Sequence, residues 1–328
     1  MKNAIDLFSA LGKRLSTFGA DDPTRRVIAE ACRANDWFRP EDIRRAVEAI
    51  AGTMLRRDLL EAWLAPHPVP VAAARRVLVV MAGNIPLVGF FDLVCVLASG
   101  HRCVVKPSAK DTVLIEYIVE QLREIEPEIP VAFYDGIEPV DAVIATGSDN
   151  ANRYFRARYA GLPALLRGSR QSVAVLSGKE TAGQLAGLFD DIWAYSGLGC
   201  RNVSLVFLPA GCDLALTMPA VNDKYRNNYL QTRALLAMTG QPFRDLGAAV
   251  VVEERAFPDA LSKICMTYYN ALEEVGTWLA EHDDQLQCVV SECVCHSRRV
   301  GFGRSQSPAL TDYPDDRDVL AFLARLDG

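Results

Sequence analysis

The sequence predicts an α/β protein built on an open parallel sheet, and three observations carry that prediction. Short apolar runs of strand length recur between residues 77 and 176. Segments with the 3.6-residue period of amphipathic helices separate them, and turns rich in glycine, proline or polar residues end most runs. Strands that alternate with helices form right-handed βαβ units, and such units assemble into parallel sheets.

The first 66 residues are expected to form helices that precede the sheet. Phe8, Leu11 and Leu15 lie on one face of the first expected helix. A second helix follows around residues 27–31, and a third begins near Pro40. The charged residues around them indicate solvated faces, so this region is interpreted as a helical lead-in and not as a site.

Strands and helices are then expected to alternate. The run 77–81 is continuously apolar, which is typical of a strand buried on both faces. The expected strands are 77–81, 103–106, 131–134, 142–145, 164–166 and 172–176, and the expected helices are 87–99, 112–125, 150–159 and 182–195. Strand-like runs at 203–208 and 248–252, with a largely helical stretch at 219–238 between them, predict a second sheet.

Composition excludes several classes of protein. The 328 residues are 50% hydrophobic and 23% charged, as in ordinary globular proteins, and the net charge of −6 argues against nucleic-acid binding. Nine scattered cysteines suit free thiols in the cytoplasm, and the first residues show no signal-peptide pattern. Residues 77–100 carry one charge, Asp92, but glycines and a proline interrupt them, so a strand, a turn and a buried helix are favoured over a membrane span.

The carboxyl ends of the first strands carry residues suited to a nucleotide. In open parallel sheets ligands bind at these ends, which here offer the amide of Asn84, the cation of Lys106 and a Gly147–Ser148 turn. That set suits a ribose and a pyrophosphate, although neither a G-x-G-x-x-G fingerprint nor a P-loop is present. Simpler roles stay open: Asn84 and Ser148 as helix caps, and Lys106 as a solvated charge.

Cys200 is the candidate nucleophile. Two glycines precede it, which allows other backbone or a flat ligand to approach the sulfur. Arg201 follows and favours the thiolate, the reactive form of a cysteine. The alternative is an ordinary buried core cysteine.

Other polar residues are interpreted as structural. A zinc site of Cys288, Cys293, Cys295 and His296 is weighed and set aside, because C-x-C-H is not a usual structural-zinc spacing; a strand of small apolar residues is favoured, with no metal. For Arg167 and Arg170, phosphate binding and surface salt bridges are equally acceptable.

Several segments, in this order and spacing, resemble the aldehyde dehydrogenase superfamily. More closely, they resemble its acyl-CoA reductase branch, the family of the bacterial luciferase-associated fatty acyl reductase. The segments are 81–90, 100–108, 142–148 and 197–204, with a late segment at 301–308 followed by Asp312 and Tyr313. The resemblance implies an aldehyde dehydrogenase-like fold with a Rossmann-type cofactor domain and a smaller α/β catalytic domain. The implied ranges are a helical lead-in packed on the cofactor domain (1–66), the NAD(P)-binding domain (67–178), the cysteine domain (179–300) and a C-terminal segment returning toward the cofactor domain (301–328).

The same resemblance implies roles for individual residues. Cys200 takes the acyl group as a thioester, and the Asn84 amide forms an oxyanion hole with the Cys200 N–H. Lys106 reaches the adenosine ribose, while Gly147 and Ser148 lie along the pyrophosphate or the nicotinamide ribose. The other cofactor-binding residues expected are Ala82, Gly83, Ser108, Thr146 and Gly168.

Departures from the superfamily pattern refine the expected reaction. Ala109 stands where oxidising members carry the glutamate that holds the ribose 2′-hydroxyl, so NADPH is the first choice, with NADH as the alternative. Leu166 stands where those members carry the glutamate that activates water, which favours attack by a thiol over hydrolysis. The chain is shorter than usual for the superfamily, and Glu253 and Glu254 are candidates for a glutamate that assists the nicotinamide.

The leading hypothesis is therefore NADPH-dependent reduction of an acyl thioester, acyl-CoA or carrier-bound, to an aldehyde. The alternatives are an aldehyde dehydrogenase that oxidises free aldehyde, a cysteine acyltransferase without redox activity, and a non-catalytic scaffold. The resemblance also fits a partner protein that transfers or activates acyl groups, and a homodimer.

Overall fold

The computed structural model describes residues 3–327, which divide into two compact units. Unit 1 comprises residues 1–169 and 307–328, and unit 2 comprises residues 170–306. Residues 1, 2 and 328, at the ends of the expected ranges 1–66 and 301–328, lie outside the described residues. The chain passes into unit 2 earlier than the expected boundary at 178, because the strand at 171–175 pairs only within the second sheet.

The helical lead-in is present in unit 1. Its helices are α1 (Ala4–Leu15), α2 (Asp22–Ala34), α3 (Pro40–Thr53) and α4 (Arg57–Leu64). The Asn3 side chain caps α1 and the Asp21 side chain caps α2, each by accepting a backbone N–H of the first turn. Phe8 and Leu11 are fully buried in a core that these helices share with one face of the first sheet.

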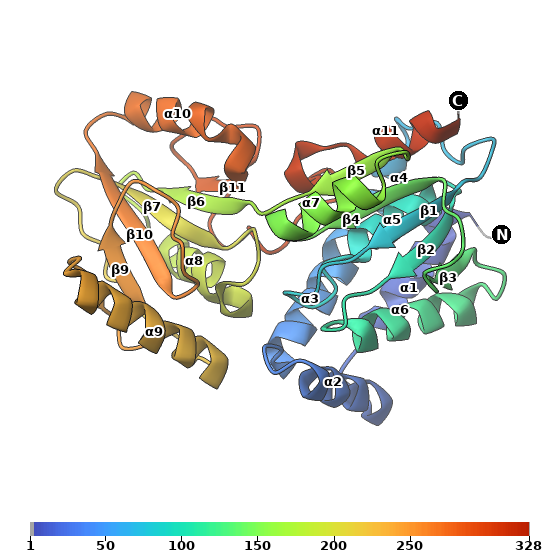
Figure 1. Cartoon of the computed structure of the whole chain (residues 1–328), viewed down its shortest axis with the longest axis horizontal. Helices are drawn as coiled ribbons and strands as arrows, with labels where there is room; N and C mark the ends of the chain where they lie inside the picture. Colours follow the sequence, from blue (N-terminus) through green and yellow to red (C-terminus); the bar gives the residue numbers. More distant parts are fainter. Residues whose placement is uncertain (1–2, 328) are drawn as a thin grey trace. The chain divides into compact units, whose positions relative to one another are not determined.

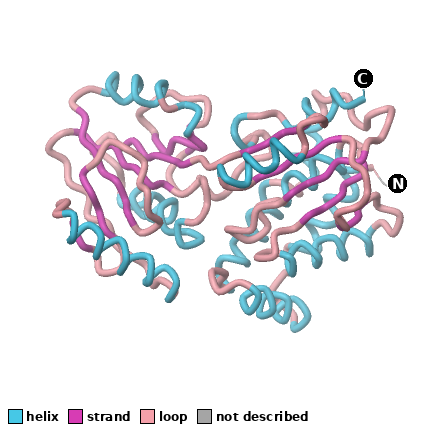
Figure 2. Tube along the Cα trace, in the orientation of Figure 1, coloured by secondary structure: helices cyan, strands magenta, loops and turns pink. Residues whose placement is uncertain are grey.

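The first sheet is entirely parallel, as expected, with strand order β3-β2-β1-β4-β5. Its strands are β1 (Arg76–Val80), β2 (Arg102–Lys106), β3 (Val131–Phe133), β4 (Ala142–Thr146) and β5 (Ala164–Arg167); its helices are α5 (Phe90–Ala98), α6 (Thr112–Ile125), α7 (Asp149–Arg158) and α11 (Val319–Ala324). Helices α5 and α6 pack in the core beneath one face and α7 in the core on the other, as Figures 1 and 2 show. The strand order reverses between β1 and β4, which is where ligands bind in such sheets.

Unit 2 contains the second expected sheet, with strand order β12-β11-β6-β7-β10-β9-β8. Its strands are β6 (Gln171–Val175), β7 (Val203–Pro209), β8 (Arg244–Asp245), β9 (Val250–Glu253), β10 (Lys263–Tyr269), β11 (Leu286–Ser291) and β12 (Arg299–Val300); its helices are α8 (Ala182–Trp193), α9 (Asp223–Thr239) and α10 (Leu272–Glu281). All neighbours are parallel except the β8–β9 pair. Helix α10 covers one face, and α8 and α9 lie on the other (Figure 1).

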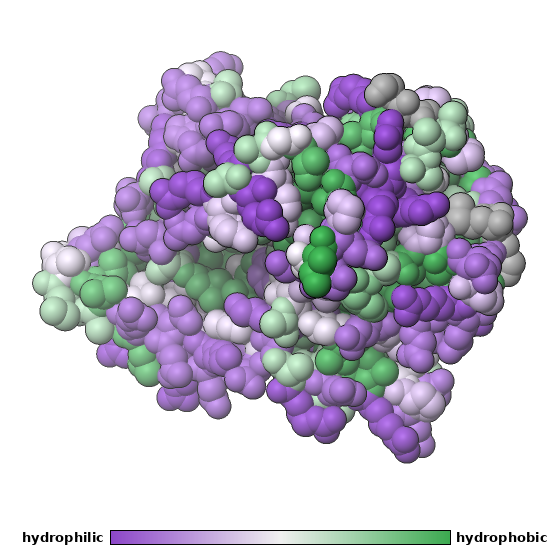
Figure 3. Space-filling model, turned by 45° about the vertical axis from the view of Figure 1, so that its right-hand side comes forward, coloured by the Kyte–Doolittle hydropathy of each residue, from purple (hydrophilic) through white to green (hydrophobic). Residues whose placement is uncertain are grey.

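Single-turn 3₁₀ segments complete the described structure. They are η1 (Ala194–Gly197), η2 (Asp283–Gln285), η3 (Pro314–Asp316) and η4 (Arg325–Asp327). On the face drawn in Figure 3, hydrophilic residues cover most of the surface, with small hydrophobic patches between them. None of the helices in residues 3–327 combines the length and the hydropathy that crossing a membrane requires.

Candidate active site

Cys200 is exposed, in a turn between α8 and β7. The interpretation as a buried core cysteine is therefore wrong. Other cysteines in the described residues do fit that interpretation: Cys95 and Cys103 are fully buried, and burial raises the pKa of both thiols. A thiol that solvent reaches is open to a substrate, so exposure separates Cys200 from these structural cysteines.

The backbone just before this turn is strained. Tyr195, Ser196 and Gly197 follow one another with φ values of 53°, 55° and 71°. Glycine adopts this left-handed region freely, but for the other two residues it costs on the order of 1–3 kcal/mol each. Both side chains are nearly buried, with 5% and 6% of their surface exposed, so the surrounding structure holds them in this conformation.

The buried side chain of Asn202 holds the turn from within. Its Oδ1 accepts the Gly199 N–H at 2.8 Å. Its Nδ2 donates to carbonyl oxygens at the end of α8 and just beyond it, those of Asp191 (3.1 Å), Ile192 (3.2 Å) and Ala194 (2.9 Å). Carbonyls at the end of a helix have no partner within it, so Asn202 acts as a helix cap that also binds the loop.

Asp191 connects the same helix to the late segment of the sequence motif. Its carboxylate, 1% exposed, accepts the N–H groups of Gly303 at 2.7 Å and Ser305 at 3.0 Å. Burial raises the pKa of Asp191, and these hydrogen bonds oppose the rise. Gly187 lies so close to this segment that a Cβ there would stand 2.8 Å from the Gly303 nitrogen, so the contact requires glycine.

Asn84 belongs to unit 1, in the turn after β1. It does not cap α5, because that helix begins only at Phe90, with Gly89 as its N-cap residue. The expected helix start at residue 87 is wrong, because the Leu87 backbone is in the left-handed region, with φ of 57°. The Leu87 N–H donates to Asp111 Oδ2 at 2.7 Å, which ties the Asn84 turn to the start of α6.

Asp111 is almost completely buried, with 3% of its surface exposed. Among the described residues, Oδ1 has no hydrogen-bond partner. Burial raises the pKa of this carboxyl from 3.8 to about 8, and the bond from Leu87 only partly offsets the rise.

The cofactor candidates of unit 1 form two groups at the carboxyl edge of the first sheet. In one, a Cβ on Gly83 would stand 2.5 Å from Ser108 Cβ, so the β1 and β2 turns meet closely next to the exposed Lys106. In the other, the Gly147 N–H donates to the Arg167 carbonyl at 3.2 Å, which joins the β4 and β5 ends. The site candidates in unit 1 are Ala82, Gly83, Asn84, Lys106, Ser108, Thr146, Gly147, Ser148 and Gly168.

Ser148 and Gly168 support α7. The Ser148 Oγ accepts the Ala151 N–H at 3.3 Å, so its role as a helix cap is confirmed. A Cβ on Gly168 would stand 2.8 Å from Asp149 Oδ1, which also accepts the Ser169 N–H at 3.1 Å. Both residues therefore shape the turn at the amino end of α7.

Arg167 forms a buried ion pair with Asp92, and neither sequence interpretation anticipated it. The Arg167 Nη1 contacts both carboxylate oxygens, at 2.8 and 2.7 Å, and lies 3.5 Å from Thr146 Oγ1. The two side chains are 3% and 7% exposed, so this is no surface salt bridge. The signal was in the sequence: Asp92 is the one charge in an otherwise apolar helix.

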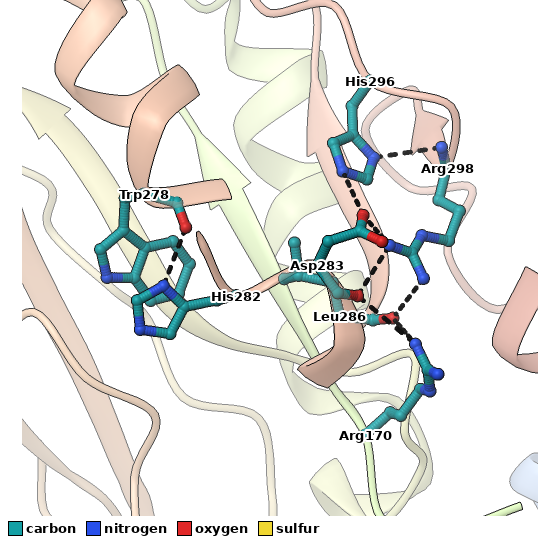
Figure 4. A network of polar contacts seen from close by, with 7 residues as sticks. All are labelled: Arg170, Trp278, His282, Asp283, Leu286, His296 and Arg298. Atoms are coloured by element: carbon teal, nitrogen blue, oxygen red, sulfur yellow. Dashed lines mark hydrogen bonds and ion pairs between the residues drawn. The ribbon is translucent and has the colours of Figure 1, made fainter. Parts of the chain in front are cut away.

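Arg170 and His296 belong to a polar network of unit 2, drawn in Figure 4. Arg170 donates to the carbonyl oxygens of Asp283 and Leu286, at 3.4 and 3.0 Å. His296 Nε2 lies 3.2 Å from the Asp283 carboxylate. Within residues 3–327, no group of three or more His, Cys, Asp or Glu side chains is arranged to hold a metal ion.

Other candidates have structural contacts. Cys288 lies in β11, as the strand interpretation expected. That interpretation is wrong for Cys293, Cys295 and His296, because β11 ends at Ser291 and they follow it in a loop. Glu254 Oε2 lies 3.0 Å from Lys263 Nζ in an ion pair, whereas Glu253 is exposed at the end of β9. Sequence reasoning missed the roles of Asn202, Ser172 and Asp111. Ser172 and Asp111 bind residues distant in the sequence, whereas Asn202 binds nearby backbone groups that no residue pattern marks.

Comparison with known proteins agrees with this architecture. Residues 18–217 match the family model of acyl-CoA reductase (LuxC). The fold is similar to an NAD⁺ complex of aldehyde dehydrogenase from Bacillus cereus, at 16% identity over 89% of this chain and 72% of that one, with a TM-score of 0.59. It is also similar to an acetylating aldehyde dehydrogenase from Geobacillus thermoglucosidasius, at 11% identity over 94% and 84%, with a TM-score of 0.63.

These comparisons support the expected fold class, an aldehyde dehydrogenase-like α/β fold with a helical lead-in. An oxidoreductase from Marinobacter aquaeolei is similar as well, at 11% identity over 94% of this chain and 78% of that one, with a TM-score of 0.64. No curated protein matches the chain.

Proposed function

Because the chain belongs to the acyl-CoA reductase (LuxC) family of oxidoreductases, we propose that it reduces an acyl thioester to an aldehyde through a covalent intermediate on Cys200. One observation carries the proposal: the matched region contains an exposed cysteine in a turn held by buried hydrogen bonds. That is the arrangement a nucleophile requires, because the sulfur must be accessible and its backbone fixed.

Cys200 performs the acyl transfer. Its thiolate attacks the thioester carbonyl, a carbon–sulfur bond forms, and the thiol of CoA or of an acyl carrier leaves with the electron pair of the old bond. The Asn84 amide and the Cys200 N–H stabilise the oxyanion of this step. When aldehyde is released, the sulfur regains its electron pair as a thiolate.

The residues at the carboxyl edge of the first sheet suit a nicotinamide cofactor. Lys106 and Ser148 are exposed beside the place where the strand order reverses, so both side chains are accessible to a bound cofactor. Lys106 would contact the adenosine ribose, and the Gly147–Ser148 turn the pyrophosphate or nicotinamide ribose. When bound, the reduced nicotinamide supplies the hydride that converts the acyl group to an aldehyde.

NADPH is the proposed form of the cofactor. Ala109 and Lys110 are exposed in the turn after β2, where a carboxylate would repel a 2′-phosphate and a cation would attract it. Ala109→Glu should therefore shift the ratio of the NADPH and NADH dissociation constants toward NADH, and Ala109→Gln controls for side-chain size. Equal shifts in both variants would contradict the electrostatic argument.

The reaction is tested with acetyl-, octanoyl- and palmitoyl-CoA, following loss of NADPH absorbance and aldehyde formation. Intact mass spectrometry without NADPH should show one acyl group, absent from Cys200→Ser. Cys295→Ser is the matched control, because Cys295 is also exposed. Asn84→Ala should slow acylation by about 10²–10³-fold.

Other outcomes separate the alternatives. Oxidation of free aldehyde to acid without CoA would identify an aldehyde dehydrogenase. Acylation of Cys200 with no binding of either nicotinamide cofactor would identify an acyltransferase. Leu166 carries no group that could activate water, which disfavours hydrolysis of the acyl-enzyme and therefore the oxidation of aldehyde to acid.

A further inference from the structure

We propose that Asn202, with Ser172 as a second anchor, is a positioning residue that fixes the Cys200 turn for acyl transfer. The inference rests on the proposed role of Cys200 as the nucleophile. The Asn202 and Ser172 side chains form hydrogen bonds with the backbone on either side of the reactive sulfur, at the Gly199 N–H and the Cys200 carbonyl.

Asn202 holds the turn ahead of the sulfur. Its amide oxygen binds the Gly199 N–H, and its amide nitrogen binds three carbonyls at the end of α8 and just beyond it. The side chain is 4% exposed, so water competes poorly for these bonds. One buried amide therefore joins the residue before Cys200 to the preceding helix.

Ser172 holds the turn on the other side. It lies in β6, which pairs with β7, and is fully buried. Its Oγ donates to the Cys200 carbonyl at 2.9 Å and accepts the Cys288 N–H at 3.1 Å. The Cys200 carbonyl is thereby fixed to an interior strand of the sheet, because β6 pairs with β7 on one side and with β11, the strand that carries Cys288, on the other.

The bonds of Asn202 explain how the strained backbone persists. Tyr195 and Ser196 stay left-handed only where their surroundings leave no relaxed alternative, and Asn202 binds the chain at Ala194 and Gly199, on either side of them. Without these bonds the segment is free to relax and to carry the sulfur with it. Acyl transfer depends steeply on geometry, and a misplacement of about 1 Å can cost on the order of 10²-fold in rate.

The frame that receives these bonds is itself fixed. Asp191 ties α8 to Gly303 and Ser305, and Gly187 permits backbone contact with the same segment. The late motif at 301–308 thus acquires a role: it supports the helix to which Asn202 attaches the nucleophile turn.

The test compares two reactions of the same sulfur in the full-length enzyme. Acylation by an acyl-CoA needs a positioned thiolate, whereas alkylation by iodoacetamide needs only an accessible one. Asn202→Ala should slow single-turnover acylation of Cys200 by about 10²-fold, while alkylation stays within about threefold and NADPH affinity is unchanged. Asn228→Ala is the matched control, because its amide donates to the Lys224 carbonyl of its own helix α9 and not to the Cys200 turn.

The ratio of the two rates decides the outcome. If Asn202 has a merely structural role, its loss lowers the fraction of folded enzyme and slows acylation and alkylation by the same factor. That result would overturn the proposal. Acylation of the variant at the wild-type rate would overturn it as well. If Asn202→Ala does not fold, Ser172→Ala replaces it and should lower the same ratio by at least about fivefold; an unchanged ratio there also overturns the proposal. Failure of the wild-type Cys200 to accept any acyl group would instead refute the proposed function, and this inference with it.

Discussion

Replacing Asp111 by asparagine should change how the stability of the protein depends on pH. In the folded protein the pKa of this carboxyl is raised from 3.8 to about 8 by burial. A folded pKa above the unfolded one means that the protonated form is the stable one. The stabilisation is complete below about pH 4 and is lost as the pH rises through about 8.

The size of the effect follows from the shift. Each pH unit between the two pKa values costs the folded state about 1.4 kcal/mol. Between about pH 6 and pH 8 the wild type should therefore lose on the order of 2–3 kcal/mol relative to Asp111→Asn. Asparagine keeps an oxygen that can accept the Leu87 N–H and does not ionise, so it mimics the protonated acid.

Urea unfolding of both proteins at several pH values measures this difference. All other titrating groups are common to the two proteins and cancel in the comparison. The difference should grow through this range and level off above about pH 9. A difference that is the same at pH 6 and pH 8.5 would refute the claim that Asp111 is buried and protonated at neutral pH.

Two further predictions concern packing and the buried ion pair. Gly187→Ala should lower the free energy of unfolding by about 1–3 kcal/mol, because the new Cβ meets Phe302 and Gly303 backbone atoms at 2.9 and 2.8 Å. Gly276→Ala is the control, because Gly276 lies on the open surface of α10. Equal melting temperatures of the two variants would count against the close contact at Gly187. Asp92→Asn should lower the free energy of unfolding, measured in urea, by about 3–5 kcal/mol, because it leaves the Arg167 charge buried without its carboxylate. Adding Arg167→Met to this variant should recover part of the lost stability. No recovery would show that the uncompensated charge is not the cause.

The sequence predicted the elements whose periodicity is strong. The continuous run at 77–81 and the amphipathic stretch at 112–125 became β1 and α6 with nearly unchanged bounds. Strand β10 was missed, because its polar Lys263 and Thr267 interrupt the apolar pattern of a buried strand. Helix α10 was missed as well, because acidic residues and a glycine interrupt its apolar pattern.

The candidate site was only partly predictable for a physical reason. Cys200 and Asn84 lie in short local motifs that glycines and turns mark in the sequence. The residues that hold them, Ser172 and Asp111, act through partners far along the chain or through burial, and neither leaves a local pattern. Asp92 shows how such a residue can be found: a lone charge in an apolar helix needs a buried partner.

Unit 1 is assembled from two stretches of chain separated by the whole of unit 2. Its last stretch carries Tyr313, whose hydroxyl accepts the Trp63 Nε1–H at 2.9 Å, and Leu323, whose carbonyl lies 3.1 Å from His101 Nε2. During synthesis on the ribosome, Tyr313 and Leu323 emerge long after Trp63 and His101, the residues that they contact. Unit 2 can therefore finish folding first, while part of the apolar surface of unit 1 stays uncovered until the stretch that begins at Ser307 has been synthesised.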